Sequence, residues 1–86
     1  MQIQFNIEIW KEGNRYVAYN PQLNLSSWGK TIEAAKKNFY EATEAFLEEA
    51  ERMGSLEQIL EEAGFIFDKN WKAPKILVSE RMSLAL

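Results

Sequence analysis

The sequence predicts an α+β fold of order β-β-β-α-α-β, in which one long helix covers an antiparallel sheet of three to four strands. Three observations predict this class. Polar and apolar residues alternate strictly at the N-terminus, and two more strand-like segments follow within about 2–28. Apolar residues then recur at helical spacing over about 32–53. Glycines end this helix and a shorter one, and mainly strand-like sequence follows.

The first strand is expected over Gln2–Trp10, where four Ile and Phe side chains share one face. The opposite face is polar except for Trp10. Gly13 and Asn14 are typical of a hairpin turn, and the RYVAY segment that follows is rich in strand-forming residues. Pro21 ends this second strand. A short third strand is expected around Leu23 and Leu25, ending at the Ser-Ser-Trp-Gly segment.

The long helix is expected to begin after Thr31, which is a good N-cap residue, and to end at Gly54. Its core stripe is predicted to be Ile32, Ala35, Phe39, Ala42, Phe46, Ala50 and Met53. A shorter helix is expected over about 55–63, closed by Gly64. The segment of about 65–86 is expected to be strand material, with Trp71 in the core or anchoring a strand edge. All 86 residues are expected to form one domain.

The chain contains no cysteine and no histidine. Disulfides, thiol nucleophiles, serine–histidine catalysis and the usual zinc sites are therefore excluded within it. No metal or cofactor is expected. The N-terminus has no basic region followed by an apolar stretch, and no apolar run is long enough for a membrane span. A cytoplasmic protein with no membrane partner is therefore expected.

The net charge of −3 is unevenly distributed. Residues 31–64 carry nine acidic and three basic side chains, whereas the segments on either side are slightly basic. An acidic surface repels phosphate backbones and attracts basic proteins. A basic protein is therefore a better expected partner than nucleic acid, although many of these Glu residues need be no more than a solvated helix face.

The ordered string from RYVAYNPQLN through SSWGKTIEAAKKNFYEATEAFLEEA resembles the HicB-like antitoxin family. That family reads aromatic-hydrophobic-Ala, Pro-acid-Leu, Gly-x-Thr-hydrophobic-Glu-x-Ala, then Asn and Glu-Ala in the following helix. The LEEAGF…W…P…V stretch also looks like its C-terminal segment, so the resemblance covers nearly the whole chain. The residues that fit the pattern are Tyr16, Val17, Ala18, Pro21, Leu23, Gly29, Thr31, Ile32, Glu33, Ala35, Asn38, Glu41 and Ala42.

This resemblance implies a partial ribonuclease-H-like fold and a non-enzymatic role. It implies binding to a small basic HicA-type ribonuclease toxin, whose catalytic surface the chain would cover. The chain departs from the family pattern at Asn20, Gln22 and Ala34, and two of these departures remove a carboxylate from the expected contact region. The expected partner contacts are Asn20, Pro21, Gln22, Leu23, Trp28, Glu41, Glu44 and Glu48.

Family members that repress their own operon usually carry an added DNA-binding domain. The sequence after the short helix holds one strand's worth of residues rather than two more helices. No appended DNA-binding domain and no direct DNA binding are therefore expected.

Large apolar side chains on polar segments are typical of interfaces. Trp10 is expected either to lie in an interface or to be covered by the short helix or the terminal strand. For Trp28 an interface is the favoured interpretation. A homodimer or higher homo-oligomer is expected, with Trp10, Ile76, Val78 and Leu84 as its candidate contacts.

Two other functions remain alternatives. The first is a stand-alone homo-oligomeric structural or ligand-binding module of the same fold without a toxin partner. The second is a Mg²⁺-dependent nuclease, for which Glu8, Glu41, Glu44 and Asp68 would have to converge. Carboxylates without demonstrated geometry are weak evidence for catalysis, so an enzyme is not expected.

Overall fold

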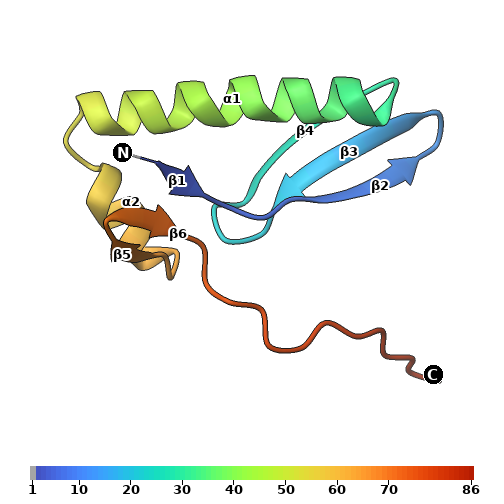
Figure 1. The fold of residues 1–86 in the computed structure, drawn as a ribbon. Coiled ribbons are helices and arrows are strands. Elements are labelled where there is room, and N and C mark those ends of the chain that lie inside the picture. Colours follow the sequence, from blue (N-terminus) through green and yellow to red (C-terminus); the bar gives the residue numbers. More distant parts are fainter. Residues whose placement is uncertain (1) are drawn as a thin grey trace.

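The computed structural model describes residues 2–86 and arranges them as two helices and two three-stranded sheets (Figure 1). The α+β class is confirmed. The prediction of a single sheet is wrong, because the described residues form two. The elements are β1 (Ile3–Gln4), β2 (Glu8–Glu12), β3 (Arg15–Asn20), β4 (Leu25–Gly29), α1 (Ile32–Arg52), α2 (Leu56–Glu62), β5 (Ile66–Asp68) and β6 (Asn70–Lys72).

Strands β2, β3 and β4 form an antiparallel meander. Gly13 and Asn14 connect β2 to β3, and the φ of +60° at Gly13 is the left-handed value that a Gly-first hairpin turn requires. This two-residue turn sets the register, which places Trp10 opposite Val17, and Val17 opposite Trp28. The three side chains therefore lie in one row across the sheet.

The second sheet has the order β1-β6-β5, with β1 parallel to β6 and β5 antiparallel to β6. The expected single strand over residues 2–10 is thus divided: β1 belongs to this sheet and β2 to the meander, and residues 5–7 between them belong to neither. Parallel hydrogen bonds run from the Trp71 amide to the Gln2 carbonyl (2.9 Å) and from the Ala73 amide to the Gln4 carbonyl (2.8 Å).

A fully buried side chain, Asn20 at the end of β3, explains the division. Its Nδ2 donates to the Asn6 carbonyl at 2.6 Å, and its Oδ1 accepts from the Leu23 amide at 2.8 Å. The Asn6 carbonyl is the next acceptor that the parallel ladder would need after Gln4. This carbonyl binds the Asn20 amide, and the ladder stops at Ala73, which Pro74 follows.

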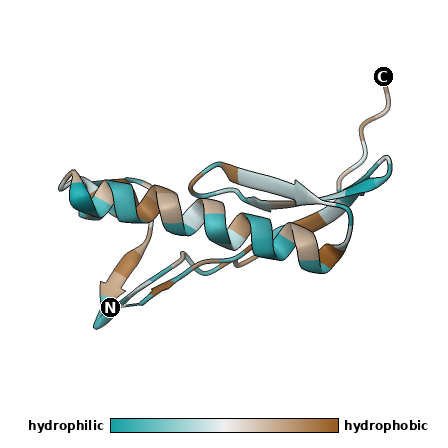
Figure 2. Cartoon of the chain, turned by 90° about the horizontal axis from the view of Figure 1, so that it is seen from above, coloured by the Kyte–Doolittle hydropathy of each residue, from teal (hydrophilic) through white to brown (hydrophobic). Residues whose placement is uncertain are grey.

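Helix α1 begins after Thr31, whose Oγ1 accepts from the Ala34 amide at 3.0 Å. Its buried residues are Ala35, Phe39, Thr43, Leu47 and Ala50. The predictions that Ile32, Ala42, Phe46 and Met53 lie in the core are wrong, because all four side chains are exposed, Met53 by 71%. Successive steps of four residues turn slightly around a helix of 3.6 residues per turn. The buried stripe therefore runs through Ala35, Phe39, Thr43 and Leu47 rather than through Ala42 and Phe46, and the side of α1 seen in Figure 2 carries both hydrophilic and hydrophobic residues.

Two apolar clusters support the fold. Under the first half of α1, Ala18, Ala35 and Phe39 are buried together. At the other end, the second cluster joins α1 to α2 and the second sheet through Leu47, Ala50, Leu56, Leu60, Phe65 and Trp71. Trp71 is only 4% exposed, which agrees with the core alternative predicted for it.

The expected strand over residues 65–86 is correct only at its start. Strands β5 and β6 end at Lys72, and residues 73–86 form neither helix nor strand. The chain leaves the second sheet after Lys72 and runs away from the folded body (Figure 1). Side chains at Ile76, Val78 and Leu84 are exposed.

Gly29, at the end of β4, lies very close to the backbone of the first turn of α1. This contact gives the first prediction. A Cβ at this position would come within 2.6 Å of the Ala35 amide nitrogen and 2.7 Å of the Ala34 carbonyl carbon. Both are backbone atoms, so α1 must move. We expect Gly29→Ala to lower the free energy of unfolding by about 3 kcal/mol in urea denaturation. Gly13→Ala meets open space and should cost only about 1 kcal/mol for its positive φ; equal losses at both positions would contradict this account.

Candidate protein-interaction site

A groove runs along one flank of α1, between the helix and the N-terminal residues. Its volume is about 250 Å³. It is lined by Ile3, Phe5, Tyr40, Thr43, Glu44, Leu47 and Glu48, and these residues are called the acidic groove below. Five of them belong to α1 at spacings of three and four, so they share one helix face. Ile3 comes from β1, and Phe5 from the unpaired residues that follow it.

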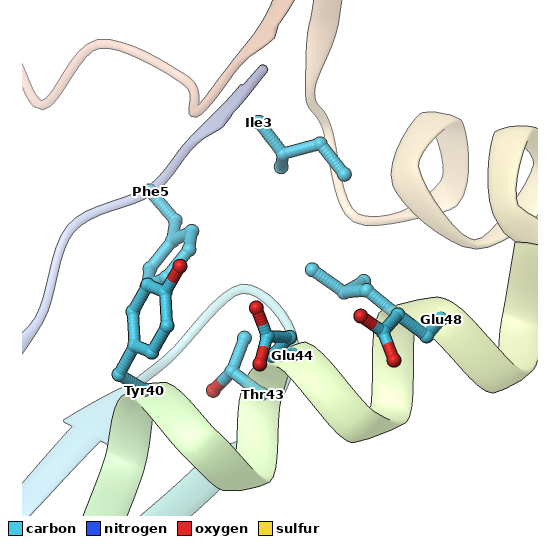
Figure 3. Close-up of a pocket in the computed structure, with 7 residues that line it drawn as sticks. Ile3, Phe5, Tyr40, Thr43, Glu44 and Glu48 are labelled. Carbon is cyan, nitrogen blue, oxygen red and sulfur yellow. The ribbon is translucent and has the colours of Figure 1, made fainter. Parts of the chain in front are cut away.

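The acidic groove combines an apolar floor with a charged rim. Ile3, Phe5 and Leu47 supply apolar surface, and Figure 3 shows Glu44 and Glu48 side by side on α1, below Ile3. Both glutamates are exposed, and neither forms an ion pair within residues 2–86. Like charges four residues apart on a helix repel each other. A cation bound between them would relieve this repulsion, and the apolar floor would accept its aliphatic stem.

Charge changes along this flank of α1. A second hollow shares Phe5 and Tyr40 with the acidic groove, and Lys36 and Lys37 line it. Beyond the other end, Glu51 joins Glu48 beside Leu47 and Ile3. The flank is therefore basic near the start of α1 and acidic toward its end. These charges would therefore favour one orientation of a ligand that lies along this flank.

Thr43 is the polar residue beneath the groove, and it gives the second prediction. It is 2% exposed, and its Oγ1 has no hydrogen-bond partner within residues 2–86. An unpartnered buried hydroxyl costs free energy, so Thr43→Val should leave stability unchanged or raise it by about 1 kcal/mol in thermal or urea unfolding. The matched control, Thr31→Val, removes the N-cap acceptor and should lower stability by about 1 kcal/mol. A clear loss of stability in Thr43→Val would show that this hydroxyl is satisfied.

The expected partner contacts do not form one site. Glu44 and Glu48 lie in the groove, and Glu41 is exposed on the same helix but does not line it. Asn20 is fully buried, so its expected role as a surface contact is wrong; its amide instead holds the chain at Asn6 and Leu23. In the turn after it, Pro21 is exposed, whereas Gln22 and Leu23 are half-buried.

Trp28 lies on a different surface, the face of the meander opposite α1. The register places it in one row with Val17 and Trp10, and the two tryptophans are 50% and 41% exposed. The Arg15 guanidinium lies over the Trp28 ring, 5.1 Å from its centroid, and the Tyr19 ring meets Trp10 edge-on at 6.0 Å. These five residues are called the open sheet face. The alternative that α2 or the terminal segment covers Trp10 is wrong in this chain.

Sequence reasoning identified both tryptophans but did not bring them together. Val17, Tyr19 and Arg15 were missed as their neighbours. The signal was present, because a two-residue turn at Gly13 and Asn14 already pairs Trp10 with Val17.

The four carboxylates of the nuclease alternative do not converge into a metal site. Within residues 2–86 no group of three or more Asp, Glu, His or Cys side chains could hold a metal ion. In the same residues no helix has the length and apolar character to cross a membrane.

The fold and these surfaces define a small α+β protein with two exposed surfaces suited to protein contacts. Comparison with protein-family models, with curated proteins and with solved structures gives no match.

Proposed function

We propose that this chain is a HicB-like antitoxin that binds and occludes a small basic ribonuclease of the HicA type. The acidic groove is the observation that carries the proposal. It places two exposed carboxylates, which have no ion-pair partner among residues 2–86, beside apolar surface on the acidic third of the chain. A basic ribonuclease that binds RNA must expose cations at its substrate surface, and such cations complement this groove.

The proposed mechanism is steric and electrostatic. The acidic groove attracts the cationic surface of the toxin and speeds association. The apolar floor formed by Ile3, Phe5 and Leu47 then gives contact area that excludes water. While the complex persists, RNA cannot bind the same cations of the toxin. The chain itself performs no chemistry and requires no cofactor in this role.

The proposed fold family is a partial ribonuclease-H-like fold. The antiparallel meander followed by α1 supports it, because its β-β-β-α order agrees with the fold that the resemblance implies. Fold family alone does not carry function, so the proposal depends on the acidic groove. We further propose that the protein acts in the cytoplasm, as a homodimer or higher oligomer and without direct DNA binding.

The second candidate function is a stand-alone homo-oligomeric module without a toxin. The open sheet face favours it, because Trp10 and Trp28 form an exposed aromatic row that a second copy could cover.

Co-expression with the product of an adjacent reading frame, followed by size-exclusion chromatography, distinguishes the two functions. The antitoxin proposal predicts co-elution with a basic protein in a complex that weakens as salt is raised. Elution as a homo-oligomer without that protein would favour the stand-alone module.

A further inference from the structure

Residues 75–86, called the tail below, are unusual in a chain that buries most of its other large apolar residues at least in part. Leu77 and Met82 are 85% and 83% exposed, and Val78 is 73% exposed. The tail makes neither helix nor strand. Exposed apolar side chains in such a number are typical of a segment that binds something.

The tail nevertheless has the pattern of a strand. Its even-numbered residues are apolar at five of six positions: Ile76, Val78, Met82, Leu84 and Leu86. Its odd-numbered residues between Leu77 and Ala85 are Ser79, Arg81 and Ser83. Apolar and polar residues that alternate in this way form a strand with one buried face.

The tail does not extend the parallel ladder of its own protomer. After Ala73 binds the Gln4 carbonyl, the next acceptor along the first strand is the Asn6 carbonyl. That carbonyl accepts from the buried Asn20 amide at 2.6 Å. Pro74 follows Ala73 directly and has no amide hydrogen to donate. Lys75 and Ile76 still line a hollow with Phe5 and Asn6, and the tail leaves the body beyond them (Figure 1). The parallel ladder therefore ends at Ala73, and the tail does not pair with β2 of its own copy.

A free strand edge is present at β2. Within residues 2–86 this strand pairs only with β3, so its other edge presents unpaired backbone groups. Its charged residues are Glu8, Lys11 and Glu12, with a net charge of −1, whereas the tail carries Lys75, Glu80 and Arg81, with a net charge of +1. Trp10, in the middle of β2, offers an aromatic partner for Ile76 or Val78. The free edge of β4 has no charged residue, and β5 has only three residues.

We infer that the tail of one copy adds as a strand to the free edge of β2 in a second copy, and that the exchange is reciprocal. Backbone hydrogen bonds supply the affinity, and the apolar face of the tail extends the open sheet face beside Trp10. Reciprocal exchange gives a closed dimer, because both copies offer the same tail and the same edge. This inference deepens the proposed homodimer by naming its contact, and it does not depend on the toxin.

The test uses the full chain alone, in light scattering coupled to size exclusion over a range of concentrations. The wild-type chain should be dimeric, and Leu77→Pro/Val78→Pro should raise the dimer dissociation constant about 100-fold, because proline removes backbone donors and adjacent amides of a strand point to opposite edges, so one of the two faces β2 in either register. Both side chains are exposed in the protomer, so its thermal unfolding should be retained. The matched control, Ser79→Ala/Ser83→Ala, changes the polar positions of the same segment and should leave the dimer intact.

Hydrogen exchange separates exchange between copies from docking within one copy. Amides of residues 76–82 should be protected at high concentration and lose protection on dilution. Protection that is independent of concentration would overturn the inference in favour of docking within one chain. A monomeric wild-type chain, or a dimer that both prolines leave unchanged, would also overturn it.

Discussion

Replacement of Asn20 by Leu is expected to lower the free energy of unfolding by about 3 kcal/mol, measured in urea. The side chain is fully buried, donates to the Asn6 carbonyl and accepts from the Leu23 amide. Leucine leaves both backbone groups without their partners, and each unsatisfied buried group costs about 1–3 kcal/mol. The loss should be global, because these bonds join the N-terminal segment, β3 and the turn before β4.

Gln22→Ala provides the graded control for this prediction. Its Oε1 accepts from the same Asn20 amide at 3.1 Å, but Gln22 is half-buried and the amide retains Asn6. A loss of less than about 1 kcal/mol is therefore expected. If Asn20→Leu were as mild as Gln22→Ala, Asn20 would not organise this part of the fold.

Charge reversal in the acidic groove, Glu44→Lys/Glu48→Lys, should weaken binding to the basic ribonuclease about 100-fold or more. The change replaces two attractive charges by two repulsive ones at the proposed contact. Most of this loss in affinity should appear as a slower association rate at low salt, measured by stopped-flow mixing. Neutralisation of Glu41, Glu44 and Glu48 to Gln should give a smaller loss and a weaker salt dependence.

Glu57→Lys/Glu61→Lys is the matched control for charge reversal. These glutamates are also exposed and four residues apart, but they lie on α2 rather than α1. The net charge changes by the same amount in both variants. Equal losses in the two would assign binding to overall charge, and unchanged binding in Glu44→Lys/Glu48→Lys would remove the acidic groove from the interface.

Local patterns in the sequence predict the α+β class, the hairpin turn at Gly13 and a helix after Thr31. These features depend on neighbouring residues, such as turn glycine and the Thr31 cap. The division of the first strand could not be predicted in this way. It depends on the contact between Asn20 and Asn6, which are fourteen residues apart. The sequence shows Asn20 only as a polar residue before proline.

The candidate site was predictable in part. Glu44 and Glu48 lie together because helical spacing fixes their shared face, and this spacing is visible in the sequence. Periodicity did not identify Leu47 as the buried residue beside them, because Phe46 fits the same stripe equally well. The choice depends on where α1 meets α2, which is a tertiary contact. Ile3 and Phe5 also reach the groove through tertiary contacts, because they pack against the cluster that contains Leu47.

A titration of HicA-type ribonuclease with this chain, followed by RNA cleavage, tests the central claim most directly. The antitoxin proposal predicts that the wild-type chain abolishes cleavage near one binding equivalent. The Glu44→Lys/Glu48→Lys variant should leave most cleavage intact, whereas Glu57→Lys/Glu61→Lys should inhibit like the wild type. Full cleavage in the presence of excess wild-type chain would contradict the proposed function while leaving the fold unchanged.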